Sequence, residues 1–279
     1  MTQKVVLITG CSTGIGRALA REAAARGLVV YATARRPETL EALAGEGMHC
    51  LALDVADPQS IARAVDAIRE RSGRLDYVIN NAGQGLFGPL AEIPLSRFNA
   101  LLQVNVGGQL AVCQACLPLM AANGAGCIVN IGSVMGVVTT PFAGAYSASK
   151  AALHLLTDAL RMEVAPFGVR VVLVQPAAVQ SQVADNALGN SDLERYAQEG
   201  SLYRDVHSYI VARAQASQDK PMPTDDFAAG VWRQLLRKSP PAVIRAGNGT
   251  GMFRLLSLLP RAVRDGLFSR RFGLNTLRR

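Results

Sequence analysis

A tyrosine and a lysine stand four residues apart in the segment YSASKAALH, as Tyr146 and Lys150. The segment opens an apolar, helix-forming run, so the two side chains are expected on one face of a helix. A phenol has an ordinary pKa of about 10 and is a poor acid or base catalyst at neutral pH. A neighbouring ammonium favours the phenolate and is expected to lower the pKa of Tyr146, and no carboxylate lies within residues 146–154 to oppose it. The pair predicts proton transfer to or from a substrate oxygen.

A glycine-rich turn, TGCSTGIG, stands between a strand-like run and a helix-compatible run. Glycine allows a tight turn and a close approach of the backbone to a pyrophosphate, and the following helix N-terminus offers unpaired N–H groups. With a strand before it and a helix after it, such a turn predicts a dinucleotide site. The residues concerned are Gly10, Ser12, Thr13, Gly14, Ile15 and Gly16.

The next strand-like run ends in YATARRPE, which bears on the choice of dinucleotide. Folds that select NAD place an acidic residue there to bind the ribose 2′-hydroxyl, whereas this chain has Ala34 followed by Arg35 and Arg36. Guanidinium groups suit a 2′-phosphate. The sequence favours NADP(H) over NAD(H), with Arg35 and Ser12 near the phosphate; the alternative, that both arginines are solvated surface charges, stays open.

Apolar, β-branched runs of strand length alternate with longer helix-compatible runs along the whole chain. Unbroken apolar strands separated by helices indicate a parallel sheet covered on both faces. The predicted fold is a doubly wound, Rossmann-type α/β sheet of about seven strands in one domain, residues 1–279. The strands are expected at 4–10, 28–34, 49–55, 75–83, 127–133, 169–176 and 242–247.

Composition narrows the class of protein. The chain has 279 residues, 49% of them apolar, and no apolar run looks long enough to cross a bilayer. Five cysteines, an odd and sparse set, fit a reducing cytoplasm, and no cluster of His, Cys or carboxylates has ligand spacing, so no metal site is expected. The start of the chain shows no targeting segment.

Two segments depart from the alternation of strands and helices. Residues 177–220, after a strand end, are rich in polar residues and tyrosine and are expected to cover the substrate. Residues 248–279 form a basic, amphipathic tail that carries most of the net charge of +8, which argues against nucleic-acid binding. The tail either lies weakly on an anionic membrane surface or packs its apolar side on the domain.

Taken together, these motifs resemble the short-chain dehydrogenase/reductase family, in its shorter single-domain branch. The resemblance covers essentially the whole chain, and several stretches are similar to 17β-hydroxysteroid dehydrogenases and 1-acyldihydroxyacetone-phosphate reductases. It rests on the glycine turn, Asp54-Val55, NNAG at 80–83, Asn105 in QVNVGG, Ser133 in NIGSVMG, and Tyr146 with Lys150.

The resemblance implies roles for four residues. Tyr146 would be the general acid in reduction and the base in oxidation, and Lys150 would tune it and bind the nicotinamide ribose. Ser133 would donate a hydrogen bond to the substrate carbonyl, and Asn105 would hold a water that links Lys150 to solvent. The cofactor contacts implied beyond the glycine turn, Arg35, Tyr146 and Lys150 are Asp54, Val55, Asn81, Ala82, Gly83, Pro176, Val179 and Ser181.

One stretch departs from the family pattern. The family commonly has Pro-Gly after strand six and then a threonine that touches the carboxamide, whereas this chain reads PAAVQS, with Ala177 and Ser181 at those positions. Ser181 keeps a hydroxyl for that contact. The sequence alone therefore leaves the path of the backbone at Ala177 open.

The predicted function is an NADP(H)-dependent oxidoreductase acting on the carbonyl or secondary alcohol of a hydrophobic substrate, such as a lipid or steroid ketone. A homodimer or homotetramer is implied by the family, and the expected location is the cytoplasm, with weak membrane contact. The rival is an NADP(H)-binding sensor without turnover. A serine hydrolase is disfavoured, because NIGSVMG lacks the G-x-S-x-G elbow.

Overall fold

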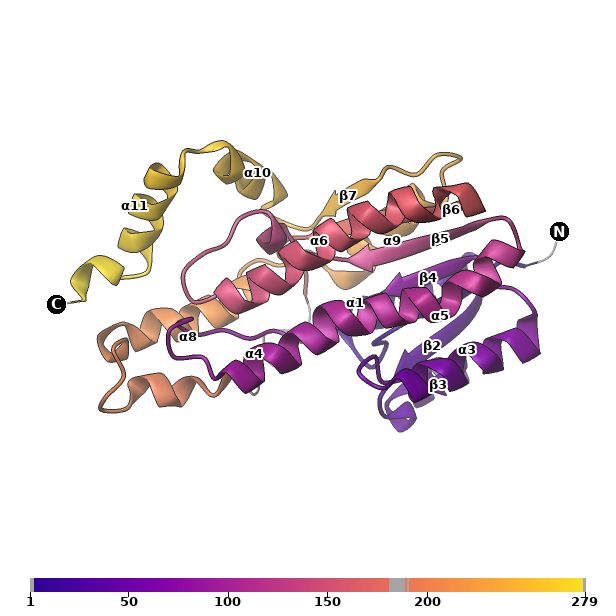
Figure 1. Ribbon diagram of the computed structural model, residues 1–279, viewed down its shortest axis with the longest axis horizontal. Coiled ribbons are helices and arrows are strands. Elements are labelled where there is room, and N and C mark those ends of the chain that lie inside the picture. The colour runs from indigo at the N-terminus through magenta and orange to yellow at the C-terminus, as the bar shows by residue number, and fades with distance from the viewer. Residues whose placement is uncertain (1–2, 181–188, 190, 278–279) are drawn as a thin grey trace.

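The computed structural model describes residues 3–180, 189 and 191–277. Its centre is one seven-stranded parallel sheet with the order β3-β2-β1-β4-β5-β6-β7, so the prediction of a doubly wound Rossmann-type sheet is confirmed (Figure 1). The order reverses between β1 and β4, where such sheets bind ligands at the carboxyl ends of the strands. The strands are β1 (Val5–Ile8), β2 (Val29–Ala34), β3 (His49–Ala52), β4 (Tyr77–Asn80), β5 (Gly126–Ile131), β6 (Val169–Pro176) and β7 (Val243–Ala246).

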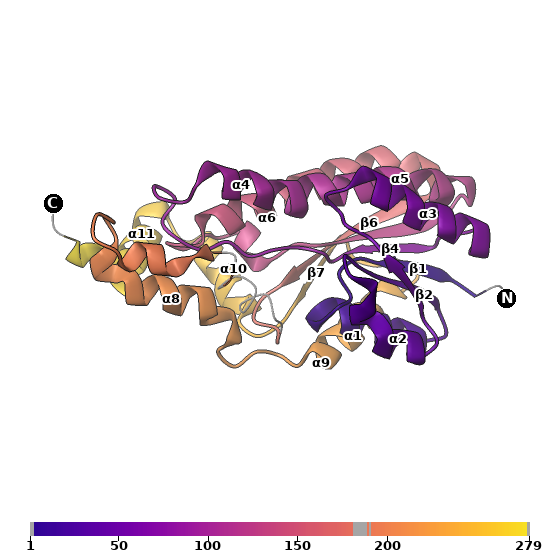
Figure 2. The ribbon, with the colours of Figure 1, turned by 90° about the horizontal axis from the view of Figure 1, so that it is seen from below.

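Helices cover both faces of the sheet (Figure 2). One face carries α1 (Gly14–Ala25), α2 (Glu41–Gly45) and α9 (Thr224–Leu235), which share a buried cluster with the strands. The other carries α3 (Pro58–Ser72), α5 (Gly108–Ala122) and α6 (Gly144–Val164), whose inner side chains form a second cluster, and α4 (Leu95–Leu102), which packs on α6 through a smaller one. Because both faces are covered, strands such as VVLI in β1 are apolar throughout.

A continuous helical stretch, Leu95–Ala122, combines α4, a π-helical turn (Gln103–Gly107) and α5. By length and composition alone it could cross a membrane, so the expectation that no apolar run has that length is wrong. Core helices of water-soluble proteins meet the same criterion. Here Val112, Cys116 and Met120 are buried in the cluster beside the sheet, and that packing accounts for the apolar composition.

Three helices that follow β6 in the sequence lie beyond the carboxyl ends of the strands (Figures 1 and 2). They are α8 (His207–Gln215), α10 (Thr250–Leu258) and α11 (Arg261–Arg271). Phe272, just after α11, meets Phe142 at 6.0 Å between ring centroids, and Phe253 and Phe268 join the same cluster. The tail therefore packs its aromatic side on the domain. The division into one domain with segments 177–220 and 248–279 stays a prediction.

Candidate active site

A cavity of about 1200 Å³ follows the carboxyl ends of the strands, from Arg35 and Asp54 at one end to Tyr146 and then to the tail. Gly16 and Asn105 do not line it, and Ser181 lies outside the described residues. The expected site residues that do line it are Gly10, Ser12, Thr13, Gly14, Ile15, Arg35, Asp54, Val55, Asn81, Ala82, Gly83, Ser133, Tyr146, Lys150, Pro176 and Val179.

The glycine turn has the conformation that its sequence predicts. Gly10 and Gly14 have φ values of +73° and +54°, in the left-handed region that favours glycine. A Cβ on Gly10 would lie 2.9 Å from the Cα of Ala82, so the turn packs directly against the next loop. Thr13 precedes α1, whose first N–H groups lie at the cavity wall formed by Ser12, Thr13 and Gly14.

Gly16 acts behind the cavity wall. A Cβ there would meet the Gly10 carbonyl and the Asn81 amide nitrogen. The Asn81 amide donates to the carbonyls of Thr9 and Gly10 at 2.9 and 3.0 Å. Gly16 and Asn81 therefore hold the turn in place, and a larger residue at 16 would push it out of position.

At the end of β2, Ala34 is buried and Arg35 and Arg36 are exposed, but Arg35 alone of the two lines the cavity. A third cation approaches from α1, because the Arg17 guanidinium donates to the backbone carbonyls of Ser12 and Thr39. Across this end of the cavity, Asp54 accepts a hydrogen bond from the backbone N–H of Ala56 at 2.9 Å. Sequence reasoning missed Arg17, although its place one turn into α1 is a usable signal.

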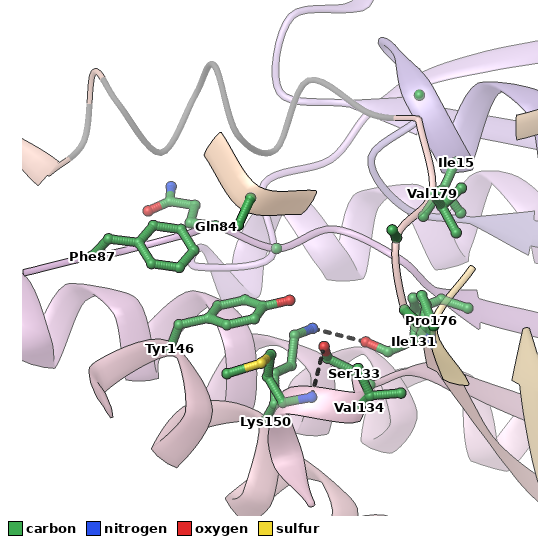
Figure 3. A pocket seen from close by; sticks show the side chains of 18 of the residues that line it. Ile15, Gln84, Phe87, Ile131, Ser133, Val134, Tyr146, Lys150, Pro176 and Val179 are labelled. Atoms are coloured by element: carbon green, nitrogen blue, oxygen red, sulfur yellow. Dashed lines mark hydrogen bonds between the residues drawn. The ribbon is translucent and has the colours of Figure 1, made fainter. Parts of the chain in front are cut away.

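Tyr146 and Lys150 lie on α6, and Ser133 follows β5, so two elements bring the three side chains to one place (Figure 3). The Lys150 ammonium is 5.8 Å from the centroid of the Tyr146 ring and donates to the Ile131 carbonyl at 2.8 Å. The Ser133 hydroxyl accepts a hydrogen bond from the backbone N–H of Met135 at 3.1 Å, which leaves its O–H available to donate.

The protonation of this pair differs from the sequence-based expectation. Burial raises the pKa of Tyr146, and the opposing influences are a hydrogen bond with Ser133 and the charge of Arg213, rather than Lys150. Burial also lowers the pKa of Lys150 to about 8. The expected net lowering of the Tyr146 pKa by Lys150 is thus wrong for this structure, because burial of the phenol is the largest influence on its pKa and Lys150 is not among the groups that oppose it.

Asn105 lies in the π-helical turn and is fully buried. Its amide nitrogen donates to the Gln84 carbonyl at 2.9 Å and to the Ser149 hydroxyl at 3.0 Å, and its oxygen accepts from the Gln84 N–H at 2.8 Å. A Cβ on Gly83 would lie 3.3 Å from that oxygen and 3.7 Å from the Lys150 ammonium nitrogen. The glycine therefore leaves space beside both polar groups.

His154, one helical turn after Lys150, was not expected at the site. Its Nε2 accepts a hydrogen bond from the backbone N–H of Ser133 at 3.4 Å. Burial, and then the charge of Lys150, lower the pKa of His154 to about 4, so the ring is neutral at pH 7 and can accept. Spacing at i+4 from Lys150 on the same helix is the signal that could have found it.

Beyond Tyr146 the cavity wall consists of residues that no motif marked. The Phe87 ring lies 5.9 Å from the Tyr146 ring between centroids. The Arg213 guanidinium stands 5.3 Å from the Phe87 ring centroid and donates to the Thr140 hydroxyl at 2.6 Å. No sequence signal identified Arg213, because α8 meets this wall only in the folded chain.

These features fit an elongated dinucleotide. The glycine cradle at Gly10 has no room for a Cβ, and the cavity is continuous from the end of β2 to Tyr146. In the described ranges of the chain, no three His, Cys, Asp or Glu side chains group as a metal site would require. The fold and site thus define a dinucleotide-binding α/β protein with a tyrosine-centred site.

Comparison with known proteins gives the family. The short chain dehydrogenase family model matches residues 4–191. A short-chain dehydrogenase/reductase of Pestalotiopsis microspora, GME11361, is 34% identical over 280 residues, covering 99% of this chain and 96% of that protein. The chain belongs to the short-chain dehydrogenase/reductase family, and it is a hydride-transferring oxidoreductase.

Solved structures agree with this assignment. A short-chain dehydrogenase from Streptomyces avermitilis has a TM-score of 0.79 and 31% identity, with 95% of each chain covered. A metagenomic short-chain oxidoreductase in complex with NADP has a TM-score of 0.59 and 35% identity over 63% of this chain and 83% of that one. A Burkholderia phymatum member in complex with NAD has a TM-score of 0.77 and 26% identity, covering 91% and 92%.

Proposed function

We propose that the protein is an NADP(H)-dependent oxidoreductase for the carbonyl or secondary alcohol of a hydrophobic substrate, with Tyr146 as general acid and base. The observation that carries the proposal is one cavity that joins the glycine turn and Arg35 at one end to Ser133, Tyr146 and Lys150 at the other. The predicted contacts at Gly10, Ser12, Asp54 and the other lining residues belong to this proposal.

The chain's own residues account for the proton transfer. A bound nicotinamide supplies the hydride in reduction and accepts it in oxidation. Ser133 donates a hydrogen bond to the substrate carbonyl oxygen, a bond that strengthens as negative charge develops there. Tyr146 delivers its proton to the same oxygen; burial raises its pKa, so the phenol is in the protonated form at neutral pH.

Three neighbouring residues support this proton transfer. Lys150, which donates to the Ile131 carbonyl, places a positive charge near the phenol, where it would stabilise the phenolate left after proton delivery. A proton would then return to Tyr146 through the space beside Gly83. Asn105 lies on the other side of that space, where it can hold a water of the proton route. His154 orients the backbone of Ser133.

The preference for NADP(H) rests on charge at the adenosine end. Arg35 lines the cavity and Arg17 lies beside Ser12, while the acidic residue typical of NAD selection is replaced by Ala34. The metagenomic relative binds NADP and the Burkholderia phymatum relative binds NAD, which supports a nicotinamide cofactor in general. The proposed preference for NADP(H) over NAD(H) rests on Arg35 and Arg17.

The substrate end of the cavity supports a hydrophobic carbonyl compound. Much of its wall is apolar or aromatic, and helices of the tail close part of it. The apolar lining residues on this side are Phe87, Val134, Met135, Met252, Phe253, Leu256, Leu267, Phe268 and Phe272. A lipid or steroid ketone matches this wall in polarity, and Ser181 and its neighbours in 181–188 lie outside the described residues.

Two exposed apolar surfaces support the proposals on assembly and location. On α6, Leu155 and Met162 lie seven residues apart on one side and are 73% and 65% exposed, which suits a homodimer or homotetramer formed through this helix and α5. On α10, Leu255 and Leu258 are exposed beside the arginines of the tail, which suits weak contact of a cytoplasmic protein with anionic membranes.

The test is oxidation of NADPH and NADH against a panel of acyl-dihydroxyacetone phosphate, steroid ketones, retinal, short-chain ketones and quinones. Tyr146→Phe removes the proton donor and is expected to lower kcat roughly 100-fold or more for the accepted ketone, with cofactor affinity unchanged. Tight cofactor binding without turnover of any carbonyl would instead support the NADP(H)-binding sensor, the alternative function. That alternative has no need of Ser133, Tyr146 and Lys150 together.

A further inference from the structure

A buried cation stands in the cavity wall next to the proposed catalytic tyrosine. Arg213, on α8, is 8% exposed, and its side-chain hydrogen bonds go from Nε to the Thr140 hydroxyl at 2.6 Å and from Nη2 to the Met135 sulfur at 3.2 Å. Its third contact is with the face of the Phe87 ring at 5.3 Å. All four residues line the cavity.

None of these partners neutralises the charge. A hydroxyl and a thioether are neutral, and sulfur is a weak acceptor. Throughout the described part of the chain, every ion pair joins other residues, and no Asp or Glu contacts Arg213. Burying a cation without a counter-charge is costly, so such groups are normally paired. Burial lowers the pKa of Arg213 only to about 10, so it stays charged at pH 7.

The position of the guanidinium relates it to the reacting atoms. The centroid of the Phe87 ring lies 5.3 Å from the Arg213 guanidinium and 5.9 Å from the centroid of the Tyr146 ring (Figure 3 shows Phe87 and Tyr146). The charge of Arg213 also lowers the pKa of Tyr146, which places it within electrostatic reach of the phenol. A group bound to Arg213 would therefore share one cavity with a carbonyl that hydrogen bonds to Tyr146 and Ser133.

We propose that Arg213 binds an anionic group of the substrate, a carboxylate or a phosphate, and so selects ketones that carry an oxyanion near the carbonyl and an apolar chain. This rests on the proposed function and specifies its substrate class. A guanidinium binds such oxyanions with charge-assisted hydrogen bonds. Arg213 lines the cavity; its Nε and Nη2 donate to Thr140 and Met135, and its Nη1 makes no hydrogen bond within the described part of the chain. The apolar chain would extend along Phe253, Leu256 and Phe268.

The experiment compares matched ketones with NADPH: a long-chain 3-oxo acid against its methyl ester, and an acyl-dihydroxyacetone phosphate against its dephosphorylated form. The variants are Arg213→Met and Arg213→Lys, and the matched control is Arg204→Met, an exposed arginine on the turn before α8. Arg213→Met should lower kcat/KM for the anionic member roughly 10- to 100-fold and leave the neutral member within about threefold. Arg213→Lys should fall between, and whichever anion suffers the larger loss identifies carboxylate or phosphate.

Equal rates for charged and neutral members in the wild type, or equal losses for both in Arg213→Met, would overturn the proposal. Equal losses together with a shifted pH profile would instead make Arg213 a positioning residue for the Tyr146 proton. Calorimetric binding of the corresponding saturated 3-hydroxy acid and of glycerol phosphate esters provides a readout without turnover. Absence of turnover with anion binding that depends on Arg213 would disprove only the proposed function, whereas binding unaffected by Arg213→Met would disprove this inference.

The thermal stability of Arg213→Met separates recognition from folding. Replacing an unpaired buried charge with an apolar side chain of similar length is expected to leave Tm unchanged or higher. A lower Tm accompanied by loss of activity toward both members of each pair would show a structural role and contradict the proposal.

Discussion

At the scale of single residues, the site combines two ionisable side chains, Tyr146 and Lys150, whose charged forms are disfavoured. Burial raises the pKa of Tyr146 and lowers that of Lys150, so both groups tend toward their neutral forms before any ligand binds. A neutral phenol can donate a proton, and a lysine with a pKa near 8 can exchange one close to physiological pH. At pH 7 Lys150 and Arg213 carry positive charges, whereas His154, which accepts a hydrogen bond from the Ser133 N–H, is neutral.

The cost of burying Lys150 predicts a pH-dependent gain in stability for Lys150→Met. The ordinary pKa of 10.5 falls to about 8 in the folded protein. Below pH 8 both folded and unfolded chains hold the proton, and the fold carries the full cost of the buried charge. Between pH 8 and 10.5 the unfolded chain binds more protons, so this cost fades as pH rises.

Lys150→Met should therefore raise the free energy of unfolding at pH 7 by up to about 3 kcal/mol, and the gain should shrink toward zero near pH 10.5. Urea denaturation of cofactor-free protein at pH 7 and pH 10 measures it. Lys238→Met, at an exposed position, is the control and should show no such dependence. A variant less stable than the wild type at pH 7 would refute the expectation.

At the scale of elements, the positions of functional residues follow from where strands end. Arg35 comes directly after β2, Asn81 directly after β4, and Ser133 two residues after the end of β5, so all three lie at one edge of the sheet. The seven strands and this edge could be predicted, because period, glycine turns and β-branched runs are local signals. The π-helical turn around Asn105 and the contact of Arg213 with Thr140 could not, because each depends on residues far apart in sequence.

The end of β2 supports a prediction on cofactor choice. Arg35→Asp should raise KM for NADPH at least tenfold and leave KM for NADH unchanged or lower, because it removes a charge-assisted bond to the 2′-phosphate and adds a carboxylate for the ribose. Steady-state kinetics with both cofactors measures it. Arg36→Asp is the matched control, since Arg36 is equally exposed but outside the cavity. Equal effects of the two substitutions would argue for a general surface charge effect.

At the scale of the whole molecule, the helices on the sheet and the helices of the tail have different structural roles. The helices on the sheet build the core, while α8, α10 and α11 close over the carboxyl ends of the strands (Figure 2). The tail packs its phenylalanines inward and leaves leucines in solvent, so it packs on the domain through its aromatic side, and membrane contact through the leucines remains a proposal. That division could not be deduced from composition.

The two exposed apolar surfaces predict a crossed result for two double variants. Leu155→Glu with Met162→Glu on α6 should convert an oligomer to a monomer in sedimentation, because like charges would meet at the interface. Leu255→Glu with Leu258→Glu on α10 should keep the oligomer but lose flotation with anionic phosphatidylglycerol vesicles. Each variant is the control for the other. An unchanged mass for the α6 variant would contradict the assembly proposal, and unchanged flotation for the α10 variant would contradict membrane contact.

Trp232 joins α9 to α1, the two neighbouring helices on one face of the sheet. It lies on α9, is fully buried, donates from Nε1 to the Leu19 carbonyl on α1 at 2.9 Å, and meets the Tyr77 ring at 5.4 Å. The helix that follows the glycine turn, α1, is thus stabilised by a residue more than two hundred positions later in the sequence. In a growing chain, α1 therefore lacks this support until α9 (Thr224–Leu235) has been synthesised. Because the sequence holds one tryptophan, intrinsic fluorescence reports the moment at which that late helix docks.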